Sequence, residues 1–348
     1  MKKKFVTLPI ILLCVFVFGG LAACAQNRYN TEIEVLMVDG ATVLPLTKMQ
    51  YRNFDINRGY NVSYTLVNSP DALIAALLRG EPDFAIAPIN VAAAMHANGS
   101  GYRLAAVTTW GLQHIVSSES IDSLNDLIGE TLFAFGRGAI PGITLRAILN
   151  KNEIPFYEPV GLNFIPNRER INIIYLASQI DVRNAITLGI LDGIPVRHAM
   201  LAEPVVTATQ MATAQNVVSF SARIDLQAEW AVHNAGQTYP QSALIFHERL
   251  LGEAHGEFLE QFIAMAHLSS LYAIHHPLTV GDWARELGSV AIPGGTVVSR
   301  AASEGRLPLD FLRALDAKSS INTFLEVLYN EAPALIGGRM PQDYFFHI

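Results

Sequence analysis

Residues 62–90 read VSYTLVNSPDALIAALLRGEPDFAIAPIN, and their pattern decides the fold class. The opening residues, Val62–Val67, are rich in β-branched and aromatic side chains and predict a strand. Ser69 suits the N-cap of a helix that begins at the following proline, and Gly80 can end that helix in the left-handed conformation. Phe84–Ala87 predicts the next strand. The order strand, helix, strand is typical of a parallel sheet covered by helices.

The same alternation extends in both directions from this stretch. Upstream, Glu32–Asp39 predicts a strand and Val43–Arg58 a helix. A second α/β unit starts near Leu124, and its predicted strands are Thr131–Phe135, Ile171–Tyr175 and Leu191–Ile194, with helices at Ile143–Asn150 and Ile180–Leu188. Ser242–Phe246 predicts a strand that returns to the first unit. Helices are then expected at Glu248–Ile274, Thr279–Leu287, Gly295–Glu304 and Ser319–Ala334. The expected fold class is therefore α/β, with two lobes of similar build.

The N-terminus has the pattern of a bacterial lipoprotein signal. Lys2, Lys3 and Lys4 precede an apolar run that ends in Leu21-Ala22-Ala23-Cys24. A positive segment, an apolar segment and small residues before the cut site are what a secretory signal needs, and Cys24 would accept the acyl chains. We expect a signal peptide over residues 1–23, a tether over 24–30 and palmitate among the lipids on Cys24. The alternative is an uncleaved membrane helix, because Phe5–Ala23 is apolar enough to span a bilayer.

The charge and cysteine content of the chain limit the kinds of molecule that it is expected to bind. Loss of the leader removes three lysines, so the formal net charge would change from −7 to −10. An acidic chain without a Lys/Arg-rich run is not expected to bind nucleic acid. Of the two cysteines, Cys14 leaves with the leader and Cys24 carries lipid, so neither a disulfide nor a catalytic thiol is expected.

Several short motifs occur in a particular order along the chain. They are Ser69-Pro70-Asp71, Ala75-Ala76-Leu77 with Gly80, Ser123-Leu124-Asn125-Asp126-Leu127-Ile128-Gly129, Ala202-Glu203-Pro204 after Gly189 and Asp192, and Tyr239-Pro240. In this order they resemble the substrate-binding lipoproteins of ABC importers, in the nitrate, sulfonate, taurine and thiamine-precursor group with the type II periplasmic-binding-protein fold. The resemblance covers nearly the whole mature chain. It implies two doubly wound sheets joined by a hinge, followed by C-terminal helices.

The resemblance also implies a division of the chain and a role. The first lobe would comprise residues 31–116 and 241–348, the second lobe 117–240, and the hinge strands would lie near His114–Ser118 and Gln241–Ile245. The implied role is capture of a small organic ligand by hinge closure and its delivery to a membrane permease and ATPase. The protein would be a lipid-anchored, extracytoplasmic monomer. The ligand would be a sulfonate-, nitrate- or taurine-like anion or zwitterion, or a thiamine-precursor-like heterocycle.

Candidate ligand-binding residues of the first lobe follow its strands. In open α/β sheets ligands bind beyond the carboxyl ends of the strands, where helix N-termini present free N–H groups. The candidates are Gly40, Ala41, Thr42, Asn68, Ser69, Asn90, Thr108, Thr109 and Trp110. Ser69 is equally explained as a helix cap. Trp110 suits stacking on a flat or cationic ligand, or packing at the hinge.

The candidates of the second lobe centre on a glycine-rich loop. They are Gly136, Arg137, Gly138, Thr144, Ser178 and Glu203, with Gln179 beside Ser178. Arg137 can form a forked pair with a carboxylate or sulfonate, or be a solvated loop residue. Glu203 can bind a ligand amine, or cap a helix and form a salt bridge. The loop lacks the third glycine of a dinucleotide fingerprint, because Pro141 stands there.

Neither metal binding nor catalysis is expected, and no cofactor is predicted. The histidines at positions 247, 255, 267, 275 and 276 have poor spacing for a metal site and are better explained as solvated helix residues. No Gly-x-Ser-x-Gly motif is present. The rival functions are an enzyme of pyrimidine-precursor synthesis on the same fold, which would need a catalytic set, and a ligand-sensing lipoprotein.

Overall fold

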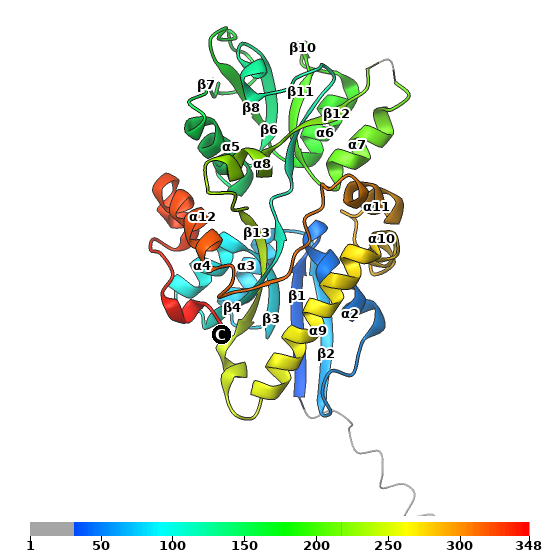
Figure 1. Ribbon diagram of the computed structural model, residues 1–348, viewed down its shortest axis with the longest axis vertical. Helices are drawn as coiled ribbons and strands as arrows, with labels where there is room; N and C mark the ends of the chain where they lie inside the picture. The colour runs from blue at the N-terminus through cyan, green and yellow to red at the C-terminus, as the bar shows by residue number, and fades with distance from the viewer. Residues whose placement is uncertain (1–30, 217, 348) are drawn as a thin grey trace, which may run out of the picture.

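A computed structural model describes residues 31–216 and 218–347 and shows two lobes, each built on a six-stranded sheet with helices around it (Figure 1). The predicted α/β, two-lobed architecture is therefore confirmed. The predicted signal peptide, Cys24 and the tether lie outside the described residues. None of the described helices combines the length and the apolar character needed to cross a bilayer.

The sheet of the first lobe has the order β14-β4-β13-β3-β1-β2. Its strands are β1 (Thr31–Val38), β2 (Tyr60–Val67), β3 (Phe84–Pro88), β4 (Tyr102–Trp110), β13 (Pro240–His247) and β14 (Leu312–Arg313). β1 is parallel to β2 and β3, and β13 is antiparallel to both β3 and β4. β13 is the predicted returning strand, and β1 to β4 all point the same way. Their carboxyl ends therefore lie along one edge.

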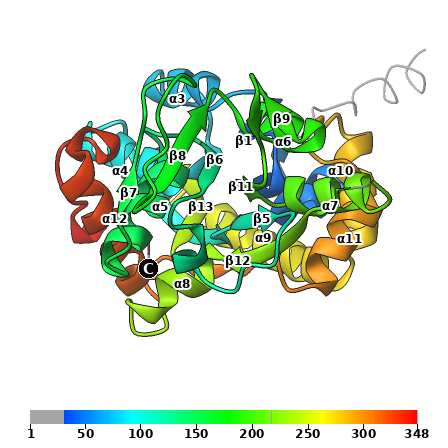
Figure 2. The same cartoon turned by 90° about the horizontal axis from the view of Figure 1, so that it is seen from above.

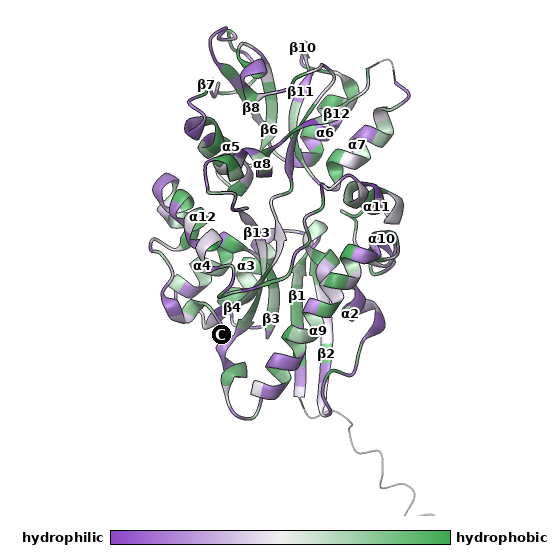
Figure 3. Ribbon diagram, in the orientation of Figure 1, coloured by the Kyte–Doolittle hydropathy of each residue, from purple (hydrophilic) through white to green (hydrophobic). Residues whose placement is uncertain are grey.

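Helices cover both faces of this sheet. They are η1 (Ala41–Leu46), α2 (Thr47–Arg52), α3 (Pro70–Leu78), α4 (Ile89–Ala97), η3 (Glu248–Leu251), α9 (Gly256–His275), α10 (Pro277–Glu286), α11 (Gly295–Ser303), α12 (Lys318–Glu331), η4 (Pro333–Ile336) and η5 (Asp343–Phe345). The long helix α9 packs on the sheet through Phe258 and Phe262, and the Phe262 ring stacks on Phe84 with centroids 3.8 Å apart. Apolar burial of this kind is the main stabilising term for the lobe. Figure 3 shows the hydrophobic residues along the inner faces of these helices.

The sheet of the second lobe has the order β12-β5-β11-β6-β8-β7. Its strands are β5 (Gln113–Ser117), β6 (Thr131–Phe135), β7 (Phe156–Tyr157), β8 (Ile171–Leu176), β11 (His198–Ala202) and β12 (Ser221–Asp225). The helices are η2 (Leu124–Leu127), α5 (Ile140–Lys151), α6 (Gln179–Leu188), α7 (Val205–Thr213) and α8 (Leu226–Val232). β6, β7, β8 and β11 run parallel to one another, as an α/β lobe requires.

One predicted strand of this lobe is wrong. Leu191–Ile194 is not part of the sheet, because its residues fall in a small antiparallel hairpin of β9 (Ile190–Leu191) and β10 (Ile194–Pro195). Asp192 and Gly193 form the turn with φ of 47° and 83°, the left-handed pair that a two-residue hairpin turn needs. The strand that enters the sheet is β11, a few residues later.

Two predicted helices are shorter than expected. The helix predicted over Val43–Arg58 begins as the 3₁₀ turn η1 and ends at Arg52, because Asn53 adopts the left-handed conformation with φ of 44°. The helix predicted over Glu248–Ile274 is interrupted, since Gly252 is extended after η3 and α9 starts only at Gly256.

The carboxyl edges of the two sheets are brought together by the connection between the lobes. β4 ends at Trp110, and β5 begins at Gln113 after two residues. Gln113 pairs with Ala202, the last residue of β11, so the start of β5 lies at the carboxyl end of β11. The carboxyl ends of β4 and of β11 with its parallel neighbours therefore adjoin the same junction. Figure 2 looks from above onto the second lobe.

Candidate functional site

The junction between the lobes is a hydrogen-bonded hinge. The amide of Gln113 donates to Gln241 Oε1 at 3.1 Å, and the Tyr239 hydroxyl donates to Gln113 Oε1. The N–H of Gly111 donates to the Tyr239 carbonyl oxygen at 3.1 Å. Tyr239 is fully buried, and this burial raises the pKa of its phenol. The two segments that join the lobes are thus bonded to each other, near the positions where hinge strands were predicted.

Most predicted site residues of the first lobe lie along its carboxyl edge. Gly40, with φ of 148°, precedes the buried Ala41 at the start of η1, and Thr42 donates its hydroxyl to the Val38 carbonyl oxygen at 3.2 Å. Asn68 is exposed. Ser69 caps α3 by accepting from the Ala72 N–H at 3.2 Å. Asn90, farther along at the start of α4, donates to the Leu335 carbonyl oxygen at 3.4 Å.

The predicted residues at the end of β4 are buried in this conformation. Thr108 Oγ1 lies 3.4 Å from the Ser242 carbonyl oxygen, and Thr109 has no hydrogen-bond partner for its hydroxyl among the described residues. The Trp110 indole donates to the Asp310 carbonyl oxygen at 3.0 Å and is only 5% exposed. Its ring therefore packs at the hinge here and offers no open face for stacking.

The predicted glycine-rich loop of the second lobe is tightly wound. Gly136 has φ of 70°, and its carbonyl oxygen accepts from the N–H groups of Ala139 and Gly142, both at 3.0 Å. A Cβ on Gly142 would come within 2.4 Å of that oxygen, so the close approach requires glycine there. Gly138 is exposed. Thr144 is 1% exposed, and its hydroxyl has no partner within the part of the chain that the structure describes.

Arg137 leads from this loop into a charged cluster that the sequence did not reveal. Glu158 accepts from Arg137 Nε at 3.1 Å and from Arg146 Nη1 at 3.3 Å. Arg146 also donates to the Arg137 carbonyl oxygen at 2.9 Å, which fixes the loop. Two guanidinium groups thus share one carboxylate, and the cluster has a formal charge of +1. The Arg137 side chain is 51% exposed, so an anion can reach it.

A cavity of about 330 Å³ opens beside this cluster. Arg137, Val160, Tyr175 and Ala177 are among its lining residues, and they come from the carboxyl ends of β6, β7 and β8. The Arg137 guanidinium lies 6.0 Å from the centre of the Tyr175 ring. Burial, followed by the nearby Glu158 charge, raises the pKa of the Tyr175 phenol, so Tyr175 stays protonated at neutral pH. The cavity is therefore partly apolar, with a cationic group at its mouth.

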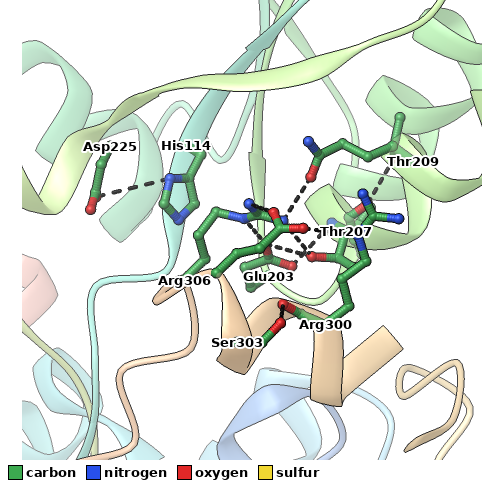
Figure 4. Close-up of polar contacts among 11 residues, drawn as sticks. His114, Glu203, Thr207, Thr209, Asp225, Arg300, Ser303 and Arg306 are labelled. Atoms are coloured by element: carbon green, nitrogen blue, oxygen red, sulfur yellow. Dashed lines mark hydrogen bonds and ion pairs between the residues drawn. The ribbon is translucent and has the colours of Figure 1, made fainter. Parts of the chain in front are cut away.

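Ser178 and Glu203 already have partners within the protein. Ser178 caps α6, accepting from the Asp181 N–H at 3.2 Å and donating to Asp181 Oδ2 at 2.7 Å. Glu203, which follows β11, forms an ion pair with Arg306 at 2.7 Å (Figure 4). Its side chain is fully buried, so the salt-bridge alternative describes Glu203 in this conformation. Within residues 31–216 and 218–347, no group of three or more His, Cys, Asp or Glu side chains is placed to hold a metal ion.

His114 lies on the other side of Arg306 in the same view. Its Nδ1 is 4.0 Å from Asp225 Oδ1, and both residues line a cavity of about 220 Å³ that Arg306 also borders. Burial lowers the pKa of His114, with the Asp225 charge acting in the opposite direction. This cavity lies at the hinge, away from the Arg137 cluster.

Comparison with known proteins gives similarity at the level of the fold. No protein-family model and no curated protein matches the chain. An ABC transporter structure from Parabacteroides distasonis has a TM-score of 0.71 at 22% identity, covering 92% of this chain and 99% of that chain. The aliphatic sulphonate binding protein SsuA from Escherichia coli has a TM-score of 0.63 at 14% identity, covering 89% and 91%.

A third similar structure is the alkanesulfonate-binding protein SsuA from Xanthomonas axonopodis pv. citri, bound to MOPS. Its TM-score is 0.59 at 14% identity, and the match covers 90% of this chain and 96% of that chain. These neighbours span nearly the whole described structure, and each is a protein of an ABC transport system or a sulfonate-binding protein. The chain therefore has the periplasmic-binding-protein fold, the fold of substrate-binding proteins of ABC transporters.

Proposed function

We propose that this chain is the solute-binding component of an ABC importer and that its ligand is a small organic anion. The fold supports the first part, because similar structures include sulfonate-binding proteins. The observation that carries the second part is the pair of guanidinium groups, Arg137 and Arg146, that share the single carboxylate of Glu158 beside the second-lobe cavity.

An anionic head group would replace part of the solvent around Arg137. A guanidinium can donate two parallel N–H bonds to a sulfonate or carboxylate, and Arg137 donates its Nε–H to Glu158 while 51% of its side chain stays exposed. The exposed Asn68 and the backbone around Gly40 lie at the carboxyl edge of the opposite lobe. Closure about the hinge would bring these groups onto the ligand and exclude water, which strengthens each polar contact.

The proposed role also needs a location and partners. We propose that the mature protein is a monomer held outside the cytoplasm by lipid on Cys24, and that it delivers its ligand to a permease driven by an ATPase. The lysines, apolar run and small residues before Cys24 support this location. In this role the protein releases its ligand chemically unchanged.

Calorimetric titration tests the ligand class. Ethanesulfonate, MOPS, taurine and nitrate are titrated into the mature protein, and we expect at least one sulfonate to bind. Arg137→Gln should weaken that binding by tenfold or more, because a charge-assisted hydrogen bond contributes about 1.5–3 kcal/mol. The matched control is Arg168→Gln, which removes an exposed arginine near the amino end of β8.

Two results would contradict the proposal. If no anion of the panel binds the wild-type protein, the ligand class is wrong. If Arg137→Gln and Arg168→Gln weaken binding equally, the effect is one of general charge and the Arg137 cluster is not the site.

A further inference from the structure

Residues 304–310, which follow α11, contact both lobes within a few residues. Arg306 reaches into the second lobe, where its guanidinium donates to Glu203 Oε1 at 2.7 Å, Thr207 Oγ1 at 2.8 Å and Gln210 Oε1 at 2.7 Å (Figure 4). Glu203 precedes α7, and the other two residues belong to it. One side chain of the C-terminal part of the chain is therefore bonded to the start of a second-lobe helix.

The next residues of the same segment are bonded to the first lobe. The Trp110 N–H donates to the Pro308 carbonyl oxygen at 3.1 Å, and the Trp110 indole donates to the Asp310 carbonyl oxygen at 3.0 Å. β14 then pairs with β4. The contact with the second lobe at residue 306 and the contact with the first lobe at residue 308 are thus only two residues apart.

Glu203 connects this segment to the hinge itself. Its backbone N–H donates to the carbonyl oxygen of Leu112, one of the two residues between β4 and β5, at 3.0 Å. Its carboxylate is fully buried and also accepts from the Thr207 N–H at 3.1 Å. A buried carboxylate that loses its cationic partner is strongly disfavoured, so the bond between Glu203 and Arg306 resists separation.

We propose that residues 304–310 form a third connection between the lobes, closed by the ion pair of Arg306 with Glu203, and that this ion pair sets how far the lobes separate without ligand. The two covalent connections leave the hinge free to bend. The third attachment lies beside these two connections, and only two residues separate its contact with the second lobe from its contact with the first. It therefore restricts bending of the hinge to one axis. Arg306 is thus a positioning residue that acts through the hinge and not through contact with ligand.

Distances between spin labels on the two lobes test this directly, and no ligand is needed. Labels are attached to Asp71→Cys on α3 and Asn184→Cys on α6, both exposed positions, in the full mature chain with Cys24→Ser. We expect one narrow distance distribution in the parent protein. Arg306→Met and Glu203→Gln should each broaden it and shift its mean by several ångströms, because each removes one charge of the pair.

The matched control is Arg79→Gln. Arg79 lies in the first lobe at the end of α3 and pairs with Glu81 at 2.6 Å, and both side chains are about half exposed. We expect its distance distribution to match that of the parent. Distributions for Arg306→Met and Glu203→Gln that also match the parent would overturn the proposal.

If Arg306→Met does not fold, the distance distribution of Glu203→Gln alone tests the proposal. This variant is expected to fold, because the glutamine amide has the shape of the carboxylate and can still accept a hydrogen bond from Arg306. If neither folds, hydrogen exchange of the wild-type protein decides. The proposal requires that amides of residues 304–310 and of the first turn of α7 become exposed in one common opening, and clearly different exchange rates would overturn it. Because these experiments contain no ligand, their failure leaves the proposed function untouched.

Discussion

The ring of Tyr239 lies so close to Gly111 that a Cβ atom at position 111 would stand 2.2 Å from the ring carbon Cζ. Gly111 belongs to the first connection between the lobes, and Tyr239 directly precedes β13 in the returning one. The Tyr239 ring is enclosed by Trp230, with centroids 5.6 Å apart, and by Phe324, with centroids 5.4 Å apart. The two connections therefore pack directly against each other at this point.

Gly111→Ala should destabilise the protein by about 1–3 kcal/mol, because an added methyl group must displace a fully buried ring. Urea unfolding measures the loss. The control is Gly138→Ala, where a Cβ would meet no atom within 4 Å. Equal losses for both variants would mean that the hinge can rearrange around the methyl group.

Ser69 and Ser178 each cap a helix, and substitution by alanine tests whether they also bind a ligand. Ser69→Ala and Ser178→Ala should each lower the free energy of unfolding by about 1 kcal/mol, since each hydroxyl accepts the N–H of the first helical turn. Ethanesulfonate titration of the same variants shows whether the hydroxyls also serve a ligand. The exposed Ser120→Ala is the control for stability. A tenfold loss of affinity in either capping variant would identify that serine as a ligand contact.

His198 makes stability depend on pH. Its Nδ1 lies 3.0 Å from Ser117 Oγ, and its Nε2 faces Glu119 and Glu130, both of which pair with Arg197. Burial lowers the pKa of His198 below its ordinary value of 6.5, against the pull of the two carboxylates. Just below this ordinary pKa, the unfolded chain therefore binds a proton at His198 that the folded protein does not bind. Stability is fully present above the ordinary pKa and falls as the pH drops below it.

We expect His198→Gln to flatten the loss of stability between about pH 7 and about pH 5, where one such histidine contributes at most about 1.4 kcal/mol per pH unit. Thermal unfolding at several pH values measures it. His276→Gln, at an exposed position, should keep the slope of the wild type. If stability depends on pH with the same slope in all three proteins, His198 binds its proton equally well in the folded and unfolded states, and the prediction is wrong.

Asp39 joins the carboxyl end of β1 to the loop between α10 and α11. Its carboxylate accepts from the Ser289 hydroxyl and from the N–H groups of Val290 and Ala291 at 2.8 and 3.0 Å. Asp39→Asn should cost about 2 kcal/mol and speed hydrogen exchange in residues 288–294, because an amide nitrogen cannot accept these bonds. Asp192→Asn, in an exposed left-handed turn, is the control and should change stability by less than about 0.5 kcal/mol.

The local signals of the sequence account for much of the first lobe. Ser69 caps α3, and Phe84 begins the next strand, because capping and strand preference depend on neighbours in the chain. The same reasoning placed a sheet strand at Leu191–Ile194, where the Asp192-Gly193 pair is instead a hairpin signal. β11 was missed because it follows Pro195 closely and contains a buried histidine.

The site was harder to predict, because its contacts join distant parts of the chain. Arg137 and Glu203 were identified as candidates, but Glu158 lies 21 residues from Arg137 and Arg306 lies 103 residues from Glu203. No local pattern relates such partners, and only the packed fold brings them together. Which of the predicted residues touch a ligand stays a prediction.

The hydrogen bond between the Glu203 N–H and the Leu112 carbonyl oxygen has a mechanical consequence. It fixes the beginning of α7 to the pivot, while the helix extends for nine residues, or about 14 Å, away from it. α7 is therefore a lever whose far end, near residues 214–216, amplifies any rotation at the pivot. A membrane protein that contacts only this far end would therefore respond to the angle between the lobes without contacting the bound ligand.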